Sequence, residues 1–345
     1  MVKDIAKMMW RMLIPVAIGV GVVIWLFYDD FKPETLDALR FDYRTVAALI
    51  AACVFVVGRD FGLTWRFHTI ADGDISWGRA LRVDLMCAFT SAITPSAVGG
   101  SALAIFYLNR EGISVGRATT LTLTTLFLDE LFFVIFCPIL FLVIPEEQLF
   151  GGGDLLLEGI KIVFWLVYAG IVIWTSILYA GIIARPHAVA NALRKLFSLK
   201  LLRRWLPDIE QTSANMIEAS HFVRNASRRW WLNVFGATVL SWFSRYLVVN
   251  ALFWGFVPSA SGLLVFGRQF VVWVVLMVSP TPGGSGISEW LFTNYYGDLI
   301  GATGIALVLA LIWRILSYYV YLVAGACLLP SYFGKTKNKH YVKTH

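Results

Sequence analysis

Two Gly-Pro motifs, each set in a long apolar stretch, constrain the fold of this chain most. The first is TPSAVGGS at Thr94–Ser101 and the second is TPGGS at Thr281–Ser285, and the two are identical once Ser96–Val98 is removed. Proline removes a backbone donor and glycine weakens a helix. In hydrocarbon, a broken backbone persists only where protein or a cavity covers it. The motifs therefore indicate matched breaks in membrane helices, a pattern typical of transport sites.

The composition predicts a membrane protein. Hydrophobic residues make up 58% of the 345 residues and charged residues 15%, against roughly 45–50% and about 25% in a soluble domain. The net charge of +7 does not indicate nucleic acid, because the basic residues lie between apolar segments and serve as topology determinants. We expect one integral membrane domain over residues 1–345, with membrane lipids as partners.

The apolar segments predict an all-α polytopic fold with about six spanning helices. A spanning helix needs ~20 apolar residues. The long segments are 12–28, 45–64, 118–144, 160–184, 232–257 and 299–329, and two shorter or interrupted segments cover 83–108 and 263–297. We expect the first segment to be retained, because no small-residue cleavage site follows it.

Charge then assigns the sides of the membrane. The N-terminus is basic, the tail 331–345 has four lysines, and the linker 185–231 has nine bases against three acids. We expect all three segments on the cytoplasmic side of a cell inner membrane. Arg66, Arg79 and Arg82 are expected to return the chain to that side. The acidic loops 29–44 and 145–159 are expected outside.

These sides force segments 83–108 and 263–297 each to enter and leave on one face, the first from the cytoplasm and the second from outside. We therefore predict two re-entrant helical hairpins arranged as an inverted repeat, with repeat 1 at about 45–144 and repeat 2 at about 232–329. The alternative is two Pro-kinked spanning helices without pseudo-symmetry.

The linker 185–231 has two interpretations. Four apolar residues could face the membrane while four basic residues face lipid phosphates: Leu193, Leu196, Phe197 and Leu201, with Arg194, Lys195, Arg203 and Arg204. The alternative is an ordinary cytoplasmic elbow.

Charges within apolar segments cost ~2.5–3.5 kcal/mol each on insertion scales and are functional candidates. The candidates for gating or charge pairing are Arg59, Asp129, Glu130, Arg245 and Arg314. Glu130 aligns with Arg314 when Gly99 is set on Gly283, so we expect Arg314 to pair with Glu130 or Asp129. The pair would be either a gate or proton-coupling site or a purely structural ion pair.

The motif tips suit an anionic head group. Ser101 and Ser285 are expected to cap the helices that follow, whose N-terminal amides and dipoles favour anions. The candidate head-group residues are Thr94, Pro95, Gly99, Gly100, Ser101, Thr281, Pro282, Gly283, Gly284, Ser285 and Glu289. The alternative is a glycine turn needed only for close packing. We expect no metal, no cofactor and no enzymatic activity, because the sequence has no HExxH, GxSxG or P-loop motif.

Three segments resemble the lysylphosphatidylglycerol synthase transmembrane region, also called the flippase-like family: Ile93–Gly116, Ser279–Leu291 and Leu311–Gly325. The family pattern is roughly Pro-Thr-Pro-Gly-Gly-x-Gly-x-x-Glu followed by an Arg in the last long helix. The matching residues are Pro280, Thr281, Pro282, Gly283, Gly284, Gly286, Glu289 and Arg314. The resemblance covers roughly residues 10 to 330.

The resemblance implies lipid translocation. In the multiple peptide resistance factors, such a region moves aminoacylated phospholipid to the outer leaflet, and a separate soluble domain makes that lipid. Here the chain ends soon after the last helix, so we expect translocation without aminoacyl transfer, with a separate lipid-modifying enzyme as a candidate partner. Two rival functions stay open: an ion-coupled small-solute transporter and a non-catalytic partner of such an enzyme.

This sequence departs from the family at two places. Many members carry a Glu and an Arg shortly after the first Gly motif, where this chain has Ser, Ala, Leu and Phe, and a Pro after the last-helix Arg is replaced by Tyr321. The first departure puts the head-group specificity of the first tip in doubt, so lysyl-phosphatidylglycerol is not assumed as substrate.

Overall fold

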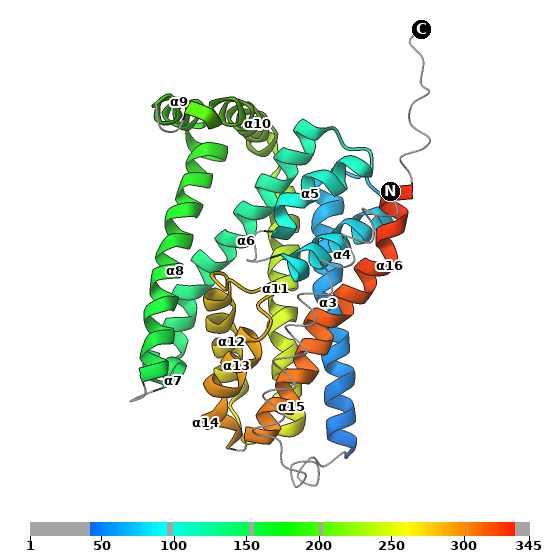
Figure 1. Ribbon diagram of the computed structural model, residues 1–345, viewed down its shortest axis with the longest axis vertical. Helices are drawn as coiled ribbons and strands as arrows, with labels where there is room; N and C mark the ends of the chain where they lie inside the picture. The colour runs from blue at the N-terminus through cyan, green and yellow to red at the C-terminus, as the bar shows by residue number, and fades with distance from the viewer. Residues whose placement is uncertain (1–41, 95–98, 152–154, 200–202, 302, 335–345) are drawn as a thin grey trace. The chain divides into compact units, whose positions relative to one another are not determined.

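The computed structural model describes residues 42–94, 99–151, 155–199, 203–301 and 303–334, whose regular elements are helices (Figure 1). The chain divides into two compact units. Of the described residues, unit 1 contains 42–60, 82–94, 99–100 and 243–334 apart from residue 302, and unit 2 contains 61–81 and most of 101–242.

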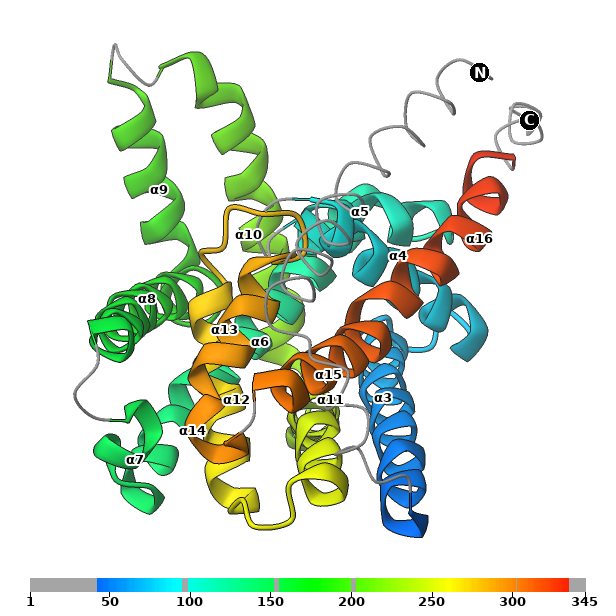
Figure 2. The ribbon, with the colours of Figure 1, turned by 60° about the horizontal axis from the view of Figure 1, so that its bottom comes forward.

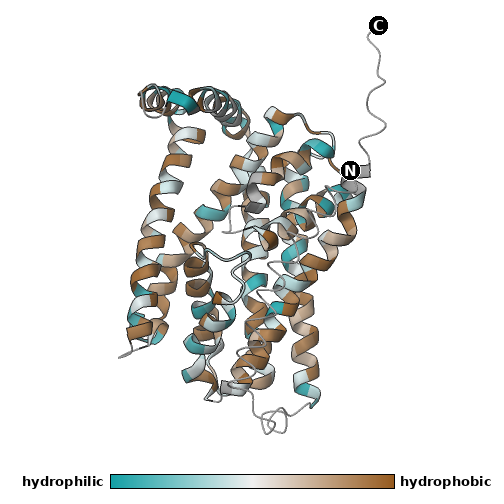
Figure 3. Ribbon diagram, viewed as in Figure 1, coloured by the Kyte–Doolittle hydropathy of each residue, from teal (hydrophilic) through white to brown (hydrophobic). Residues whose placement is uncertain are grey.

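Five long helices in the described part are apolar enough to cross a membrane. They are α3 (Tyr43–Ile70), α6 (Val115–Val143), α8 (Leu155–Tyr179) with the π-turn η1 (Ala180–Ala184), α11 (Arg228–Phe256), and α15 (Thr303–Arg314) continued by η3 (Ile315–Tyr319) and α16 (Val320–Gly334). Apolar residues cover most of α8 (Figure 3). The structure thus confirms a multi-pass membrane protein, while the expected helix 12–28 lies outside the described residues.

The first motif segment folds back on itself. It forms α4 (Trp77–Ile93) and α5 (Gly99–Arg110), of 17 and 12 residues, both shorter than the ~20 residues that span a membrane. A Cβ added to Gly100 would lie 2.5 Å from the carbonyl oxygen of Cys87. These two residues would be ~20 Å apart in one continuous helix, so a single Pro-kinked helix is ruled out here.

The second motif segment also folds back. It forms α12 (Gly262–Leu276) and α13 (Ile287–Tyr295), followed by the short α14 (Gly297–Ile300). The buried Arg268 of α12 donates to the carbonyl oxygen of Tyr295 at 2.8 Å and, through Nη2, to the Asp298 carboxylate at 2.7 Å. Contacts between the first half of α12 and the end of α13 require antiparallel packing, which also rules out a kinked single helix.

Unit 2 is organised around a buried arginine. Arg66 of α3 binds both carboxylate oxygens of Asp129 of α6, at 2.6 and 3.1 Å, and Trp242 donates to the same carboxylate at 2.9 Å. Arg66, one of the three basic residues expected to return the chain to the cytoplasmic side, is buried, and α3 continues past it to Ile70. Burial of this charge is offset by the bidentate pair.

A helical hairpin follows α8 in unit 2. Its arms are α9 (Pro186–Phe197) and α10 (Leu206–Asn225), with the 3-10 turn η2 (Arg203–Trp205) before α10. At the other end of α8 lies the short α7 (Glu146–Phe150) (Figure 1).

Close packing in unit 1 depends on small residues. A Cβ added to Gly325 of α16 would lie 2.1 Å from the Phe89 ring of α4. Glycine therefore lets these two helices approach each other.

Gly325→Ala should lower the melting temperature of the purified protein. The new methyl overpacks against the Phe89 ring, which typically costs about 1–3 kcal/mol. Gly170→Ala is the matched control, because Gly170 lies exposed on α8 with open space around its Cα. There the gain in helix propensity, up to about 1 kcal/mol, predicts no loss of stability. Equal melting curves for both variants would contradict the packing.

Asp129→Asn should destabilise the protein much more than Glu130→Gln. Neutralising Asp129 leaves Arg66 as an uncompensated buried charge, at a cost of about 3 kcal/mol or more. The Oε2 of the neighbouring Glu130 has no hydrogen-bond partner among the described residues, so its replacement removes no bond from that atom. Thermal unfolding in one detergent measures both variants, and a larger loss for Glu130→Gln would disprove the assignment.

Candidate functional site: the second Gly-Pro loop

The loop between α12 and α13 requires its glycines. Gly283, Gly284 and Gly286 have φ of 55°, 70° and 83°, a left-handed region that other residues rarely adopt. At Gly283 there is also no room, because a Cβ would lie 2.2 Å from the Tyr318 ring and 2.9 Å from the carbonyl oxygen of Ala92. The predicted close-packing role of this glycine is therefore observed.

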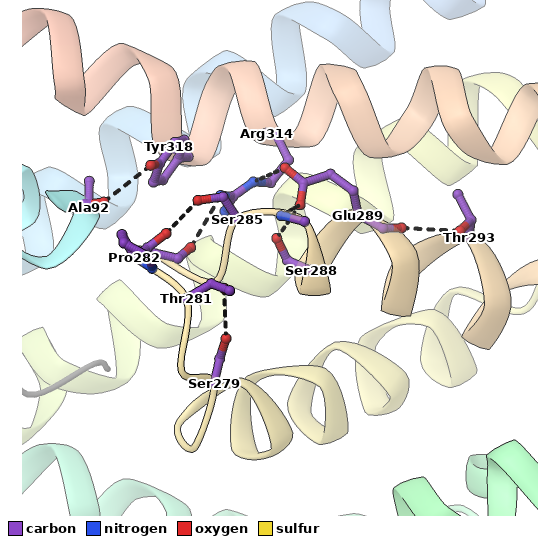
Figure 4. A network of polar contacts seen from close by, with 12 residues as sticks. Ala92, Ser279, Thr281, Pro282, Ser285, Ser288, Glu289, Thr293, Arg314 and Tyr318 are labelled. Atoms are coloured by element: carbon purple, nitrogen blue, oxygen red, sulfur yellow. Dashed lines mark hydrogen bonds and ion pairs between the residues drawn. The ribbon is translucent and has the colours of Figure 1, made fainter. Parts of the chain in front are cut away.

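The two Gly-Pro motifs meet in unit 1. The amide of Gly283 donates to the carbonyl oxygen of Thr94 at 3.3 Å. The Tyr318 hydroxyl donates to the carbonyl oxygen of Ala92 at 3.1 Å, which links the last long helix to the end of α4 (Figure 4). Segments almost 190 residues apart in sequence thus satisfy each other's backbone groups.

Some predicted residues of the first tip are only partly placed. Pro95 and the side chain of Ser101 lie outside the described residues. Gly99 begins α5, and Gly100 is buried against α4.

The centre of the second loop is a buried ion pair. Arg314 Nε donates to Glu289 Oε1 at 2.9 Å, and Arg314 Nη2 donates to the carbonyl oxygen of Gly283 at 3.2 Å. The guanidinium carbon lies 4.0 Å from the centre of the Tyr318 ring. The exposed fractions of Glu289 and Arg314 are 2% and 5%. One cation therefore joins α15, α13 and the glycine turn.

The partner of Arg314 differs from the expected one. Sequence alignment of the motifs predicted Asp129 or Glu130, but the guanidinium binds Glu289, while Asp129 binds Arg66. The prediction was wrong because it placed the pair from the repeat alignment, whereas the turn of the loop brings Glu289 next to Arg314.

Glu289 also completes the start of α13. Its Oε2 accepts from the amide of Gly286 at 2.7 Å and from the Ser288 hydroxyl at 2.9 Å. Gly286 is the N-cap residue, and Ser285 instead donates to the carbonyl oxygen of Pro282. The expectation that Ser285 caps this helix is therefore wrong, since a carboxylate already takes the anion position at the helix N-terminus.

The remaining loop residues support the turn. Thr281 and Ser279 share a hydrogen bond between their hydroxyls at 3.1 Å. A Cβ added to Gly284 would lie 3.5 Å from a methyl carbon of Leu276.

The other predicted gating charges have partners of their own. Arg59 donates to Asp60 at 2.6 Å and lies 4.3 Å from the centre of the Tyr321 ring, and the Tyr321 hydroxyl donates to Asp60 at 2.8 Å. Arg245 lies 4.5 Å from the centre of the Trp273 ring. These contacts place Arg59 and Arg245 in unit 1 outside the ion pair of Arg314.

Sequence reasoning missed the aromatic partners of the cations. Tyr318 follows Arg314 by four residues, so the two share a helix face. That spacing was the signal for Tyr318. Tyr321 was noted only as a departure from the family pattern, yet its hydroxyl binds Asp60. The contact with Asp60 had no local signal, because it joins distant helices.

The site holds one anion, the Glu289 carboxylate, between a buried guanidinium and the Gly286 amide of the left-handed turn. The amides of Gly283, Gly284 and Ser285 donate to carbonyl oxygens. Among the residues that the structure describes, no group of three or more His, Cys, Asp or Glu side chains could hold a metal ion.

Comparisons with known proteins agree with these observations. The family model of the lysylphosphatidylglycerol synthase transmembrane region matches residues 12–325. A UPF0104 membrane protein from Archaeoglobus fulgidus is 24% identical over 258 residues, which cover 73% of this chain and 75% of the relative. No solved structure matches this chain.

The match includes both Gly-Pro motifs, Glu289, Arg314 and all five described long helices except the C-terminal end of the last one. This chain belongs to the lysylphosphatidylglycerol synthase transmembrane-region family.

Proposed function

We propose that this chain moves a phospholipid, or another anionic or modified lipid, between the leaflets of the membrane, and that it is not an enzyme. The observation that carries the proposal is the buried Arg314–Glu289 pair at the broken backbone of the second loop. Placing a charged side chain inside a membrane costs free energy, so the buried Arg314 side chain indicates a substrate pathway. The family match supports the membrane-embedded role, because the matching model describes a transmembrane region.

The proposed mechanism is an exchange of partners on Arg314. Nε and Nη2 hold Glu289 and the turn, whereas Nη1 has no hydrogen-bond partner in the described part of the chain. A head-group phosphate bound to the free side of the guanidinium competes with the Glu289 carboxylate. Charge-assisted hydrogen bonds from Arg314 to the phosphate then offset the hydrogen bonds that Arg314 loses to Glu289. The glycine turn rearranges at the same time, because Arg314 also binds the carbonyl oxygen of Gly283.

We propose that the two motif segments are re-entrant and that repeat 1 (45–144) and repeat 2 (232–329) are inverted copies. Support comes from the order of elements: α3, α4–α5 and α6 in one half, and α11, α12–α13 and α15–α16 in the other. The termini would then be cytoplasmic in a cell inner membrane, and a separate lipid-modifying enzyme is a possible supplier of the lipid.

Arg314→Gln should reduce lipid translocation by about ten- to a hundredfold, the value of one hydrogen bond to a charged group. The assay uses proteoliposomes with head-group-labelled anionic or zwitterionic lipid and a membrane-impermeant quencher. Each rate is divided by the amount of folded protein.

Arg268→Gln is the matched control, because it removes the ion pair of another buried arginine of unit 1, with the exposed Asp298, outside the loop. It should lower stability and leave the rate per folded molecule unchanged. If the parent protein moves no lipid of either class, with or without a proton gradient, the solute-transporter and scaffold functions replace this proposal. If Arg268→Gln and Arg314→Gln slow transport equally, the loop has no special role.

The inverted repeat predicts that the turn between α3 and α4 and the turn between α11 and α12 lie on opposite sides of the membrane. Asp72→Cys and Ser259→Cys, both exposed positions in these turns, test this in a background without the four natural cysteines. An impermeant maleimide added to intact cells should label Cys at 259 and leave Cys at 72 unlabelled until the cells are opened. Labelling of both from the same side would refute the inverted repeat.

A further inference from the structure

The α9–α10 hairpin is anchored at the end of a spanning helix. Arg224 of α10 donates through Nε to the carbonyl oxygen of Ile183 at 2.6 Å and through Nη2 to that of Ala184 at 2.7 Å. These are carbonyls at the C-terminal end of the α8–η1 helix, which lack helical partners of their own. The hairpin is therefore held at the level where α8 leaves the hydrocarbon.

The α9–α10 hairpin lies across the direction of α8, the helix that precedes it. Figure 1 shows α8 lengthwise while α9 and α10 appear nearly end-on, and Figure 2 shows the two arms extending beyond α8. α8 with η1 is long and apolar enough to cross a membrane, so a hairpin lying across its end is placed to follow a membrane surface.

α9 has two apolar surfaces and needs only one of them for its contact with α10. At 100° per residue, Pro186 and Ala190 form one stripe with the half-buried Leu193 and Phe197, and this stripe is covered by protein. A second surface, which we call the free apolar strip, consists of Ala192 and Leu196 of α9 and of Leu199, two residues beyond the end of α9, all exposed. The exposed fractions of Leu196 and Leu199 are 50% and 56%, as on the lipid-facing side of a spanning helix.

Basic residues lie close to the free apolar strip in the sequence. Lys195 flanks the strip on α9, Arg194 lies on the opposite side of that helix, and Arg203 and Arg204 precede α10, all four exposed. The acids of the linker, Asp208, Glu210 and Glu218, lie along α10. An apolar strip next to positive charge matches the boundary between acyl chains and anionic head groups.

We propose that the α9–α10 hairpin is an anionic-lipid-binding element that lies on the membrane surface, with Ala192, Leu196 and Leu199 in the acyl boundary and Arg194, Lys195, Arg203 and Arg204 on head-group phosphates. The contact is independent of translocation and of the Arg314 loop. Each basic residue near an anionic surface strengthens it about fivefold. Of the four apolar residues expected from the sequence to face the membrane, Leu196 is exposed, Leu193 and Phe197 are half-buried on the covered stripe, and Leu201 lies outside the described residues.

Depth measurements on a fluorescent label test the proposal. Ala192→Cys and Asn191→Cys are prepared in a variant without Cys53, Cys87, Cys137 and Cys327 and labelled with an environment-sensitive dye. Position 192 is on the free apolar strip, and its exposed neighbour Asn191 is on the polar arc and serves as the matched control. The protein is placed in nanodiscs of phosphatidylcholine alone or mixed with phosphatidylglycerol.

With phosphatidylglycerol, the label at 192 should be quenched by spin-labelled lipid and protected from iodide, whereas the label at 191 should stay open to iodide. Changing the four basic residues to Gln should return position 192 toward the iodide access of position 191, while Arg314→Gln should leave both labels unchanged. Equal iodide access at both positions in anionic nanodiscs would overturn the proposal. Protection at 192 in native membranes but not in pure lipid would also overturn it and assign the strip to a protein partner.

Discussion

A broken helix inside hydrocarbon leaves backbone donors and acceptors that water cannot reach, and each of these groups needs a protein partner. In this chain the breaks satisfy one another: the Gly283 amide binds the Thr94 carbonyl, and Tyr318 binds the Ala92 carbonyl. The second break therefore depends on the first. Glycine at position 283 is required both by its backbone conformation and by the space between Tyr318 and Ala92.

The same constraint explains how the intramembrane charges are arranged. Three buried or half-buried arginines have a carboxylate or an aromatic ring close by: Arg314 has Glu289 and Tyr318, Arg59 has Asp60 and Tyr321, and Arg66 has Asp129. Local pairing keeps the cost of burial acceptable. In the proposed function, a lipid phosphate would replace the Glu289 carboxylate on Arg314, since both anions can accept charge-assisted hydrogen bonds from a guanidinium.

Much of the fold followed from composition and periodicity. Hydropathy located the long helices, and Pro and Gly located both breaks within a few residues. The folding back of 83–108 and 263–297 was inferred from loop charges and agrees with the antiparallel contacts of Gly100 and Arg268. These features are local, since they depend on transfer free energy and backbone freedom over short stretches.

The partners of the charges were not local. Aligning the motifs suggested Arg314 with Glu130 or Asp129, and only the path of the loop showed that Glu289 reaches Arg314 first. The burial of Arg66 was not expected from the sequence either, and it follows from the length of α3, which continues to Ile70. By itself, the sequence determined where helices run and break, because hydrophobicity and backbone propensity act along the chain. Only the tertiary structure decided which charged side chains form ion pairs. Ion pairs and shared hydrogen bonds join segments that are far apart in the sequence, and sequence separation does not determine their distance in space.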